Sequence, residues 1–145
     1  MDLTRRPATP ADIPYLMQLR RATMDAHLAA SGMDTSDACH EARLLHRFDC
    51  AQLLETGGRP AGLLKVVREG GCWEIVQIQL DPALQGQGLG WRLLQELIDE
   101  ADAAGAGLRL KVLLNNPARQ LYQRLGFAVT GIDGAEYRME RGRTA

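Results

Sequence analysis

Near its middle the chain carries one glycine-rich run, Leu80-Asp81-Pro82-Ala83-Leu84-Gln85-Gly86-Gln87-Gly88-Leu89-Gly90. Apolar residues before the run predict a strand over residues 73–81, and an apolar stripe after it predicts a helix from about residue 89 to Gly105. Glycines at a helix start let successive backbone N–H groups point at one spot, where the helix dipole adds positive potential. The run is therefore a candidate pyrophosphate cradle that needs neither a lysine nor a metal.

Two other phosphate-binding loops do not fit this run. A Walker loop requires Lys-Ser/Thr after its last glycine, whereas Gly90 precedes Trp91 and Arg92. A dinucleotide fingerprint counted from Gly86 would need a glycine where Trp91 stands. A turn without any ligand stays open on this run alone, because short glycine patterns are common.

Outward from the run, the hydrophobic period alternates between strand and helix. We expect strands over residues 3–6, 51–56, 61–68, 73–81, 108–114, 127–132 and 136–141, and helices over about 10–31, 35–47, 89–105 and 118–125. The strand over 108–114 follows a crossover helix, which predicts that it pairs parallel to residues 73–81. The order β-α-α-β-β-β-α-β-α-β-β predicts an α/β (α+β) fold in a single domain over residues 1–145, with a mixed, mostly antiparallel sheet flanked by helices.

Composition excludes several classes of protein. The 145 residues, 46% hydrophobic and 24% charged, are typical of one globular domain, and a net charge of −1 argues against nucleic acid or anionic membranes as partners. Apolar runs stay well short of the ~18 residues of a membrane span, and residues 1–7 carry no secretory signal, so we expect a cytoplasmic protein. We expect no metal site, because the spacing of Cys39, His40, His46 and Cys50 differs from that of structural zinc.

Two motifs carry a resemblance to a known family. Gln85-x-x-Gly88-x-Gly90 resembles the Q/R-x-x-G-x-G/A acetyl-CoA loop of the GNAT acetyltransferase superfamily, and Ile78 to Pro82 resembles its strand-then-proline lead-in. Residues 115–127 resemble its N-x-x-A-x-x-L-Y-x-x-x-G-F signature at every named position. The resemblance implies a GNAT-like fold, with an acetyl-CoA-binding core over residues 73–127 and variable acceptor-side helices over residues 10–50.

The resemblance also implies an activity and a set of cofactor contacts. The activity is direct transfer of an acetyl group from acetyl-CoA to a primary amine in a ternary complex. The implied cofactor-binding residues are Ile78 and Leu80 for pantetheine, Gln85, Gly86, Gln87, Gly88, Leu89 and Gly90 for the pyrophosphate, and Asn115 and Tyr122 beside the cofactor arm. A strand amide near Leu80 is the expected oxyanion donor.

Tyr122 is the candidate general acid that the resemblance implies. A phenol of ordinary pKa ~10 holds its proton at neutral pH and can give it to a leaving thiolate. On the helix alone, the alternative is an aromatic that packs beside Leu121 and Leu125.

Glu74 is the candidate base, because it lies eleven residues before Gln85, where some members of the superfamily carry a glutamate. Strict alternation along the strand predicts one face with Glu74, Val76 and Ile78 and an opposite face with Gln77 and Gln79. A partly buried carboxylate could then act on an ammonium group through water. A solvated strand residue, with an ordered water chain as the base, is the alternative.

The acceptor is less constrained by the sequence. The helices over residues 10–50 mix acidic and basic side chains, so we expect only an amine on a small molecule or a peptide. A non-catalytic acyl-CoA sensor or partner-dependent subunit on the same fold is the alternative function. The resemblance also makes a homodimer through the terminal strands an expectation.

Overall fold

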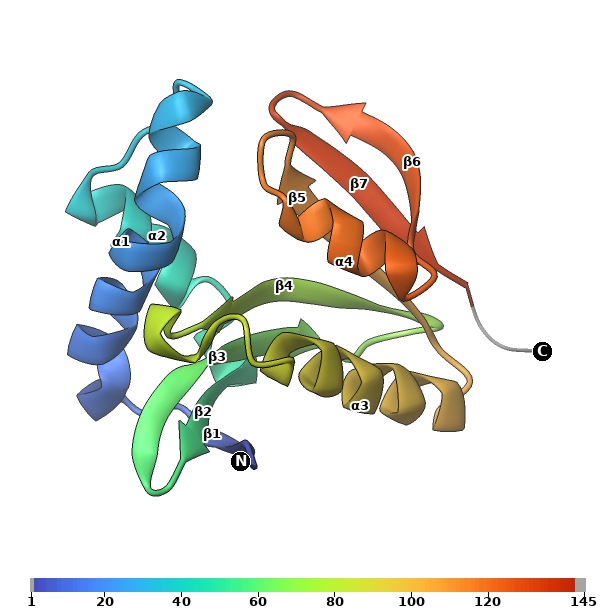
Figure 1. Ribbon diagram of the computed structural model, residues 1–145, viewed down its shortest axis with the longest axis horizontal. Coiled ribbons are helices and arrows are strands. Elements are labelled where there is room, and N and C mark those ends of the chain that lie inside the picture. The colour runs from blue at the N-terminus through green and yellow to red at the C-terminus, as the bar shows by residue number, and fades with distance from the viewer. Residues whose placement is uncertain (1, 143–145) are drawn as a thin grey trace.

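The computed structural model describes residues 2–142 as a seven-stranded sheet of order β1-β2-β3-β4-β5-β7-β6, with helices on both faces (Figure 1). The elements are β1 (Thr4–Pro7), α1 (Ile13–Ala30), α2 (Asp37–Leu45), β2 (Ala51–Thr56), β3 (Arg59–Val67), β4 (Cys72–Leu80), α3 (Leu89–Ala103), β5 (Gly107–Leu113), α4 (Ala118–Arg124), β6 (Ala128–Asp133) and β7 (Glu136–Arg141). Only β4 and β5 pair in parallel; the other neighbours are antiparallel. The predicted fold class and element order are confirmed.

Two apolar clusters lie on the two faces of the sheet. One packs α3 and α4 against the central strands, with Leu64, Leu97 and Leu108 at most 1% exposed. The other packs α1 and α2 against β2 and β3, with Leu16 and Leu44 fully buried. Helices α1 and α2 lie on one face of the sheet, toward one of its ends, and helices α3 and α4 lie on the other face (Figure 1).

Helix α2 is shorter than predicted and is fixed at both ends. Its start is set by Ser36, whose hydroxyl accepts a hydrogen bond from the Cys39 N–H at 3.2 Å. Its last carbonyls accept hydrogen bonds from the buried ammonium group of Lys65 on β3, including Leu44 O at 2.7 Å. A charged donor from the sheet therefore replaces the partners that a helix end lacks.

The parallel joint between β4 and β5 is short. Pairing runs only from Cys72–Gly107 to Ile75–Leu110, although both strands continue. Beyond Ile75 the two strands separate, and the edge of β4 that faces β5 has no strand partner among the described residues. The sheet therefore contains a split at its centre.

A β-bulge lies beside the start of this split. Val66 of β3 pairs with Ile75, whereas Lys65 pairs with Gln77, so Val76 is an extra residue on β4. The bulge inverts the side-chain alternation of the strand from this point onward.

The bulge corrects the predicted placement of Glu74. Ile75 packs into the α3/α4 core, so its neighbour Glu74 points to the opposite face, toward the α1/α2 layer. Gln77 pairs with Lys65 on that same face. The prediction that Glu74 lies opposite Gln77 and Gln79 was wrong, because strict alternation does not allow for an inserted residue.

None of the helices in the described part of the chain is long and apolar enough to cross a membrane.

Candidate active site

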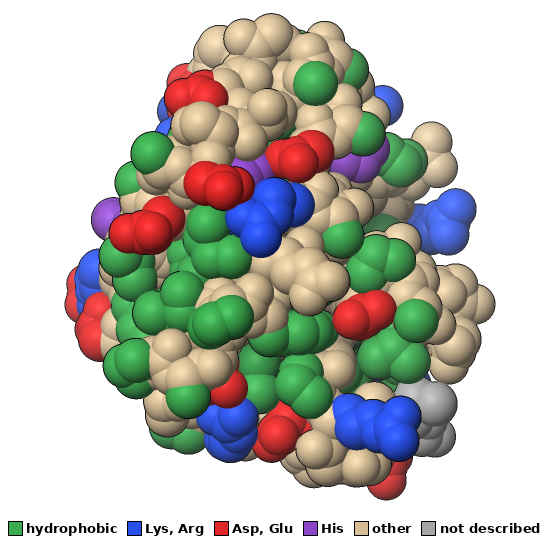
Figure 2. All heavy atoms as spheres, turned by 90° about the vertical axis from the view of Figure 1, so that its left-hand side faces the viewer, with side chains coloured by type: hydrophobic (Ala, Val, Ile, Leu, Met, Phe, Trp, Pro, Cys, Tyr) green, Lys and Arg blue, Asp and Glu red, His purple; other side chains and the backbone are tan. Residues whose placement is uncertain are grey.

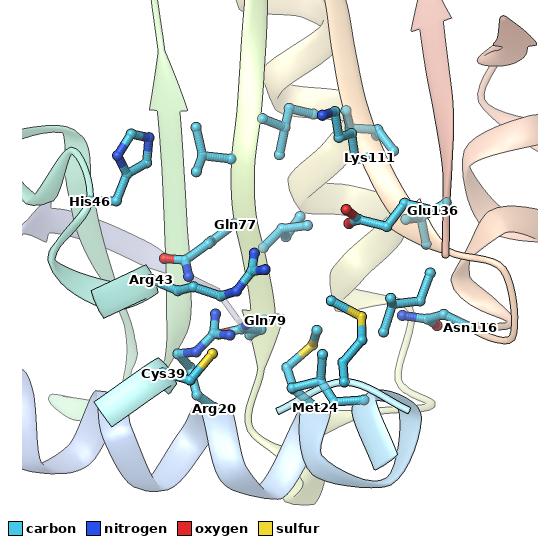
Figure 3. A pocket seen from close by; sticks show the side chains of 18 of the residues that line it. Arg20, Met24, Cys39, Arg43, His46, Gln77, Gln79, Lys111, Asn116 and Glu136 are labelled. Atoms are coloured by element: carbon cyan, nitrogen blue, oxygen red, sulfur yellow. The ribbon is translucent and has the colours of Figure 1, made fainter. Parts of the chain in front are cut away.

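A cavity of about 450 Å³ lies at the split in the sheet. Its walls come from α1, α2, β4, β5 and the start of β7 (Figure 3), and Tyr122 of α4 also lines it. This volume lies within the range of about 300–1,000 Å³ that is usual for small-molecule sites. The split therefore opens a cavity of suitable size for a small ligand between helices α1 and α2 and the central strands.

The open edge of β4 offers backbone donors to this site. Asp81 donates its N–H to Ala61 O of β3 at 2.8 Å. Successive N–H groups along a strand point to opposite edges. The N–H groups of Leu80 and Ile78 therefore point away from β3, toward the open edge. Ile78 also lines the cavity.

The glycine run forms a tight turn between β4 and α3. Gly86 and Gly88 have φ of 81° and 75°, a left-handed conformation that favours glycine, and Gly88 is the N-cap of α3. Asp81 braces the turn: its carboxylate accepts from the Ala83 N–H at 3.0 Å and from the Tyr15 hydroxyl at 3.2 Å. The side-chain amide of Gln85 donates to Leu80 O at 3.3 Å.

This turn fits the diphosphate of coenzyme A. A Cβ added at Gly86 or Gly88 would meet no atom within 4 Å, so the space in front of the turn is open. Residues 85–88 are exposed, and the N–H groups in the first turn of α3 have no intrahelical acceptor. Backbone donors at a helix N-terminus suit a diphosphate that carries its own negative charge.

Tyr122 is buried, with 8% of its surface exposed, and it lines the cavity. Its ring packs edge-on against Phe127, with the ring centroids 5.9 Å apart. Burial raises the pKa of Tyr122 to about 12, so its phenol stays protonated at neutral pH. Tyr122 is therefore a packing aromatic whose protonated side chain also lines the cavity.

The two asparagines before α4 take different places. The side chain of Asn115 donates to His27 O near the end of α1, at 3.2 Å, and thereby connects α1 to the β5–α4 loop. Asn116 is the one that lines the cavity, and its side-chain oxygen accepts from the Ala118 N–H at 3.0 Å. The N-x-x-A spacing singled out Asn115 and missed its neighbour.

The sequence-based search also missed a carboxylate. Glu74 is half-buried on the cavity's side of the sheet but is not among the residues that line it. Glu136, at the start of β7, does line it, and its carboxylate points inward (Figure 3). Glu136 reaches the cavity because β7 pairs with β5, which places Glu136 opposite Leu113. The sequence alone did not indicate this pairing.

The opposite wall is basic and polar. Arg20 of α1 and Arg43 of α2 extend their guanidinium groups into the cavity, beside Gln77 and Gln79 of β4 (Figure 3). The sequence showed these arginines only as part of a mixed set of charges, and no spacing rule separated them from the others. No cluster of three potential metal ligands occurs within residues 2–142, where His40 instead contacts Arg20 and Asp25.

Comparison with known proteins agrees with this geometry. The family model described as "Acetyltransferase (GNAT) family" matches residues 14–127. The N-alpha-acetyltransferase RimI of Mycobacterium tuberculosis is 37% identical over 89 residues, which are 58% of this chain and 55% of that protein. The streptothricin acetyltransferase of Streptomyces lavendulae is 42% identical over 65 residues, 43% of this chain and 34% of that protein. The chain thus spans about half the length, or less, of these curated relatives.

Solved structures show the same fold. The PaiA N-acetyltransferase of Thermoplasma acidophilum, crystallised with coenzyme A, superposes with a TM-score of 0.76 at 18% identity, over 98% of this chain and 99% of that one. The ribosomal-protein-S18-alanine N-acetyltransferase of Escherichia coli gives a TM-score of 0.71 at 24% identity, over 99% and 96%. With its split sheet and glycine turn, the chain belongs to the acetyltransferase (GNAT) family.

Proposed function

We propose that this protein is an acetyl-CoA-dependent N-acetyltransferase that acts on a primary amine by direct transfer in a ternary complex. The observation that carries the proposal is the split between β4 and β5, where a cavity meets a free strand edge that runs into the glycine turn. The family match and the coenzyme A complex of the PaiA enzyme support it.

The backbone would hold the coenzyme. The N–H groups of residues 85–90 receive its diphosphate, and the free edge at Ile78 and Leu80 pairs with its pantetheine arm, as an added strand would. Bound acetyl-CoA supplies an acetyl group activated as a thioester. The outward N–H near Leu80 stabilises the negative charge that develops on the carbonyl oxygen during transfer.

Two proton transfers remain for the side chains. Tyr122, with its pKa raised to about 12, donates a proton to the departing thiolate. The acceptor must enter as a neutral amine, so a carboxylate takes its proton through water. We propose Glu74 as that base. Glu136 is a second candidate, because it lines the cavity.

The test combines binding with turnover. Calorimetry should show one site for acetyl-CoA in Gly58→Glu and in the unmodified protein, but no binding in Gly88→Glu. Both glycines are exposed and have a φ of 75°, so a side chain meets an unfavourable backbone conformation at either position. Gly58 lies between β2 and β3, outside the glycine run, whereas Gly88 is the N-cap of α3. Acetyl-CoA consumption across a panel of primary amines then reports catalysis. Tight binding of acetyl-CoA without acetylation of any amine would contradict the enzyme and support the non-catalytic acyl-CoA sensor.

We also expect a homodimer through the terminal strands. The edge strand β6 exposes two apolar side chains, Val129 and Ile132, which supports this contact. Analytical ultracentrifugation of the protein and of Ile132→Lys tests it, and a monomer in both samples would contradict it.

A further inference from the structure

We propose that the acceptor of this enzyme carries a carboxylate beside its primary amine, and that Arg20 and Arg43 bind this carboxylate. The inference rests on the proposed acetyltransferase function and names the class of its second substrate. A small amino acid is the acceptor that best combines the two groups. Its ammonium group would face Gln77, Gln79 and Glu136.

Arg20 is placed as a buried anion receptor. Its side chain is 3% exposed, and its Nε donates to His40 Nδ1 at 3.2 Å. The other ring nitrogen of His40 bonds Asp25 Oδ1 at 2.6 Å, so a three-residue chain fixes the guanidinium. Within residues 2–142, the two terminal nitrogens of Arg20 have no hydrogen-bond partner in the protein. They are free to form the paired contact that a carboxylate makes with a guanidinium.

Arg43 makes this arrangement unfavourable without an anion. Burial lowers the pKa of Arg20, and the positive charge of Arg43 lowers it further. The carboxylate of Asp25 lies beyond the His40 ring and cannot sit between the two guanidinium groups. A buried cation next to a second cation is costly unless an anion joins them. A carboxylate between Arg20 and Arg43 would relieve both the repulsion and the desolvation.

The rest of the cavity is suited to the amine. Gln77 and Gln79 are each 8% exposed, and their side-chain Oε1 atoms are buried without a partner in the described chain. A rotation about the last side-chain torsion turns either carbonyl toward an ammonium donor in the cavity. Glu136 supplies a negative charge from the facing wall, and the structure shows no ion pair for it within residues 2–142 (Figure 3). Lys111 lines the same wall, but its ammonium group pairs with Asp133 at 3.6 Å. The two ends of the acceptor thus meet opposite charges.

The outer surface does not share this pattern. The face that Figure 2 shows, over α1 and α2, mixes acidic, basic and histidine side chains. Among the Asp, Glu, Lys and Arg side chains of these two helices, only Arg20 and Arg43 line the cavity. Met24, Leu28 and Met33 line the space beside them. A cavity of about 450 Å³ must also admit the acetyl end of the coenzyme, which favours a small acceptor with a short apolar side chain.

The experiment compares acceptors in matched pairs. Free amino acids and their carboxamides are assayed with saturating acetyl-CoA, together with short peptides that carry an acidic or a neutral second residue. Losing a charged hydrogen-bond pair costs about 1.5–3 kcal/mol, so we expect kcat/KM to fall about 10- to 150-fold from acid to amide. Preference for the acidic peptides would identify a side-chain carboxylate as the source of the same chemistry.

Two variants assign the preference to this wall. In Arg43→Gln, the KM of the acid should rise toward that of its amide, while the KM of acetyl-CoA stays unchanged. Arg43 is exposed at its helix, so its replacement spares the core. Arg21→Gln is the matched control: Arg21 lies on α1 outside the cavity and pairs with Asp37. Arg21→Gln should keep the full preference.

The outcomes separate this inference from the function on which it rests. Equal kcat/KM for acids and amides would overturn the carboxylate site and leave the acetyltransferase intact. Binding of the acceptors to the coenzyme A complex is also measured by calorimetry. Binding selective for carboxylates without turnover would support the site and refute the activity. Selectivity that survives Arg43→Gln would overturn the assignment to this wall.

Discussion

Tyr122 is a packing aromatic, and we propose that it is also the general acid; local sequence could not separate these two roles. Its ring is buried against Phe127, as a packing aromatic would be, yet it lines the cavity. The same burial that makes it part of the core raises the pKa of its phenol to about 12. The packing of Tyr122 and the acid chemistry that we propose for it therefore both follow from one location.

Tyr122→Phe should separate them. The variant keeps the ring and its contact with Phe127, so the melting temperature should change by less than a few degrees. Loss of a general acid should lower kcat about 10²-fold or more, with little effect on the KM of acetyl-CoA. Steady-state kinetics and thermal melts check this. An unchanged kcat would leave Tyr122 with a packing role only.

The identity of the base is a second question at single residues. Glu136 lines the cavity and Glu74 does not, so Glu136→Gln should lower kcat/KM more than Glu74→Gln. Each change removes a charge while keeping the shape of the side chain. The pH dependence of kcat/KM is measured for both variants. The variant that loses the fall in kcat/KM at low pH has lost the base. A larger loss in Glu74→Gln would restore the assignment made from the eleven-residue offset.

Helix α2 depends on a single lysine of the sheet. Lys65 is fully buried and donates to carbonyls at the end of α2, while α2 also carries Arg43 of the cavity wall. Burial lowers the pKa of Lys65 to about 8, and the charge of Arg20 adds to this shift. The cavity wall formed by α2 is therefore joined to the sheet through a desolvated cation.

Lys65 makes the free energy of unfolding vary with pH in the alkaline range. Its folded pKa of about 8 lies below the ordinary 10.5, so between these values the unfolded chain binds more protons. The free energy of unfolding due to Lys65 should therefore rise with pH across this window, by at most about 1.4 kcal/mol per pH unit. Below about pH 8 the full cost of burying the charge remains.

Urea denaturation at several values between pH 7 and pH 10 measures this effect as the difference between the unmodified protein and Lys65→Met. The other lysine of the chain provides the control: Lys111 is exposed and pairs with Asp133 at 3.6 Å, so Lys111→Met should keep the unmodified slope. A parallel pH dependence in the protein and Lys65→Met would refute the lowered pKa.

The whole sheet consists of two parts with a short joint. Strands β1 to β4 meet β5 to β7 only through the four paired positions from Cys72–Gly107 to Ile75–Leu110 and through the apolar core beneath. A coenzyme in the split would contact both parts. Binding should therefore stabilise the molecule as a whole and not only the turn.

Acetyl-CoA at about one hundred times its Kd should add about 2.7 kcal/mol to the free energy of unfolding. For a chain of this size that raises the melting temperature by roughly 5–10 °C. Hydrogen exchange should slow at amides of both β4 and β5. Protection limited to residues 85–90 would show that the coenzyme does not enter the split.

Local patterns along the chain were sufficient for the fold and for the glycine turn. Periodicity, turn residues and helix signals are short-range properties, so they predicted the order of strands and helices and the parallel joint. The spacing from Gln85 to Gly90 likewise located a turn whose two positive-φ glycines the structure contains. These features depend on neighbours in the sequence, which a single chain displays.

The charged lining of the cavity was decided only by tertiary structure. Arg20, Arg43 and Glu136 come from three distant segments, and no spacing connects them before α1, α2 and β7 pack around the split. The extra residue at Val76 reversed the predicted face of Glu74, because a bulge depends on the partner strand and not on the strand's own alternation. Burial also gave Lys65 and Tyr122 their shifted pKa values, since desolvation depends on what the rest of the chain places around a group.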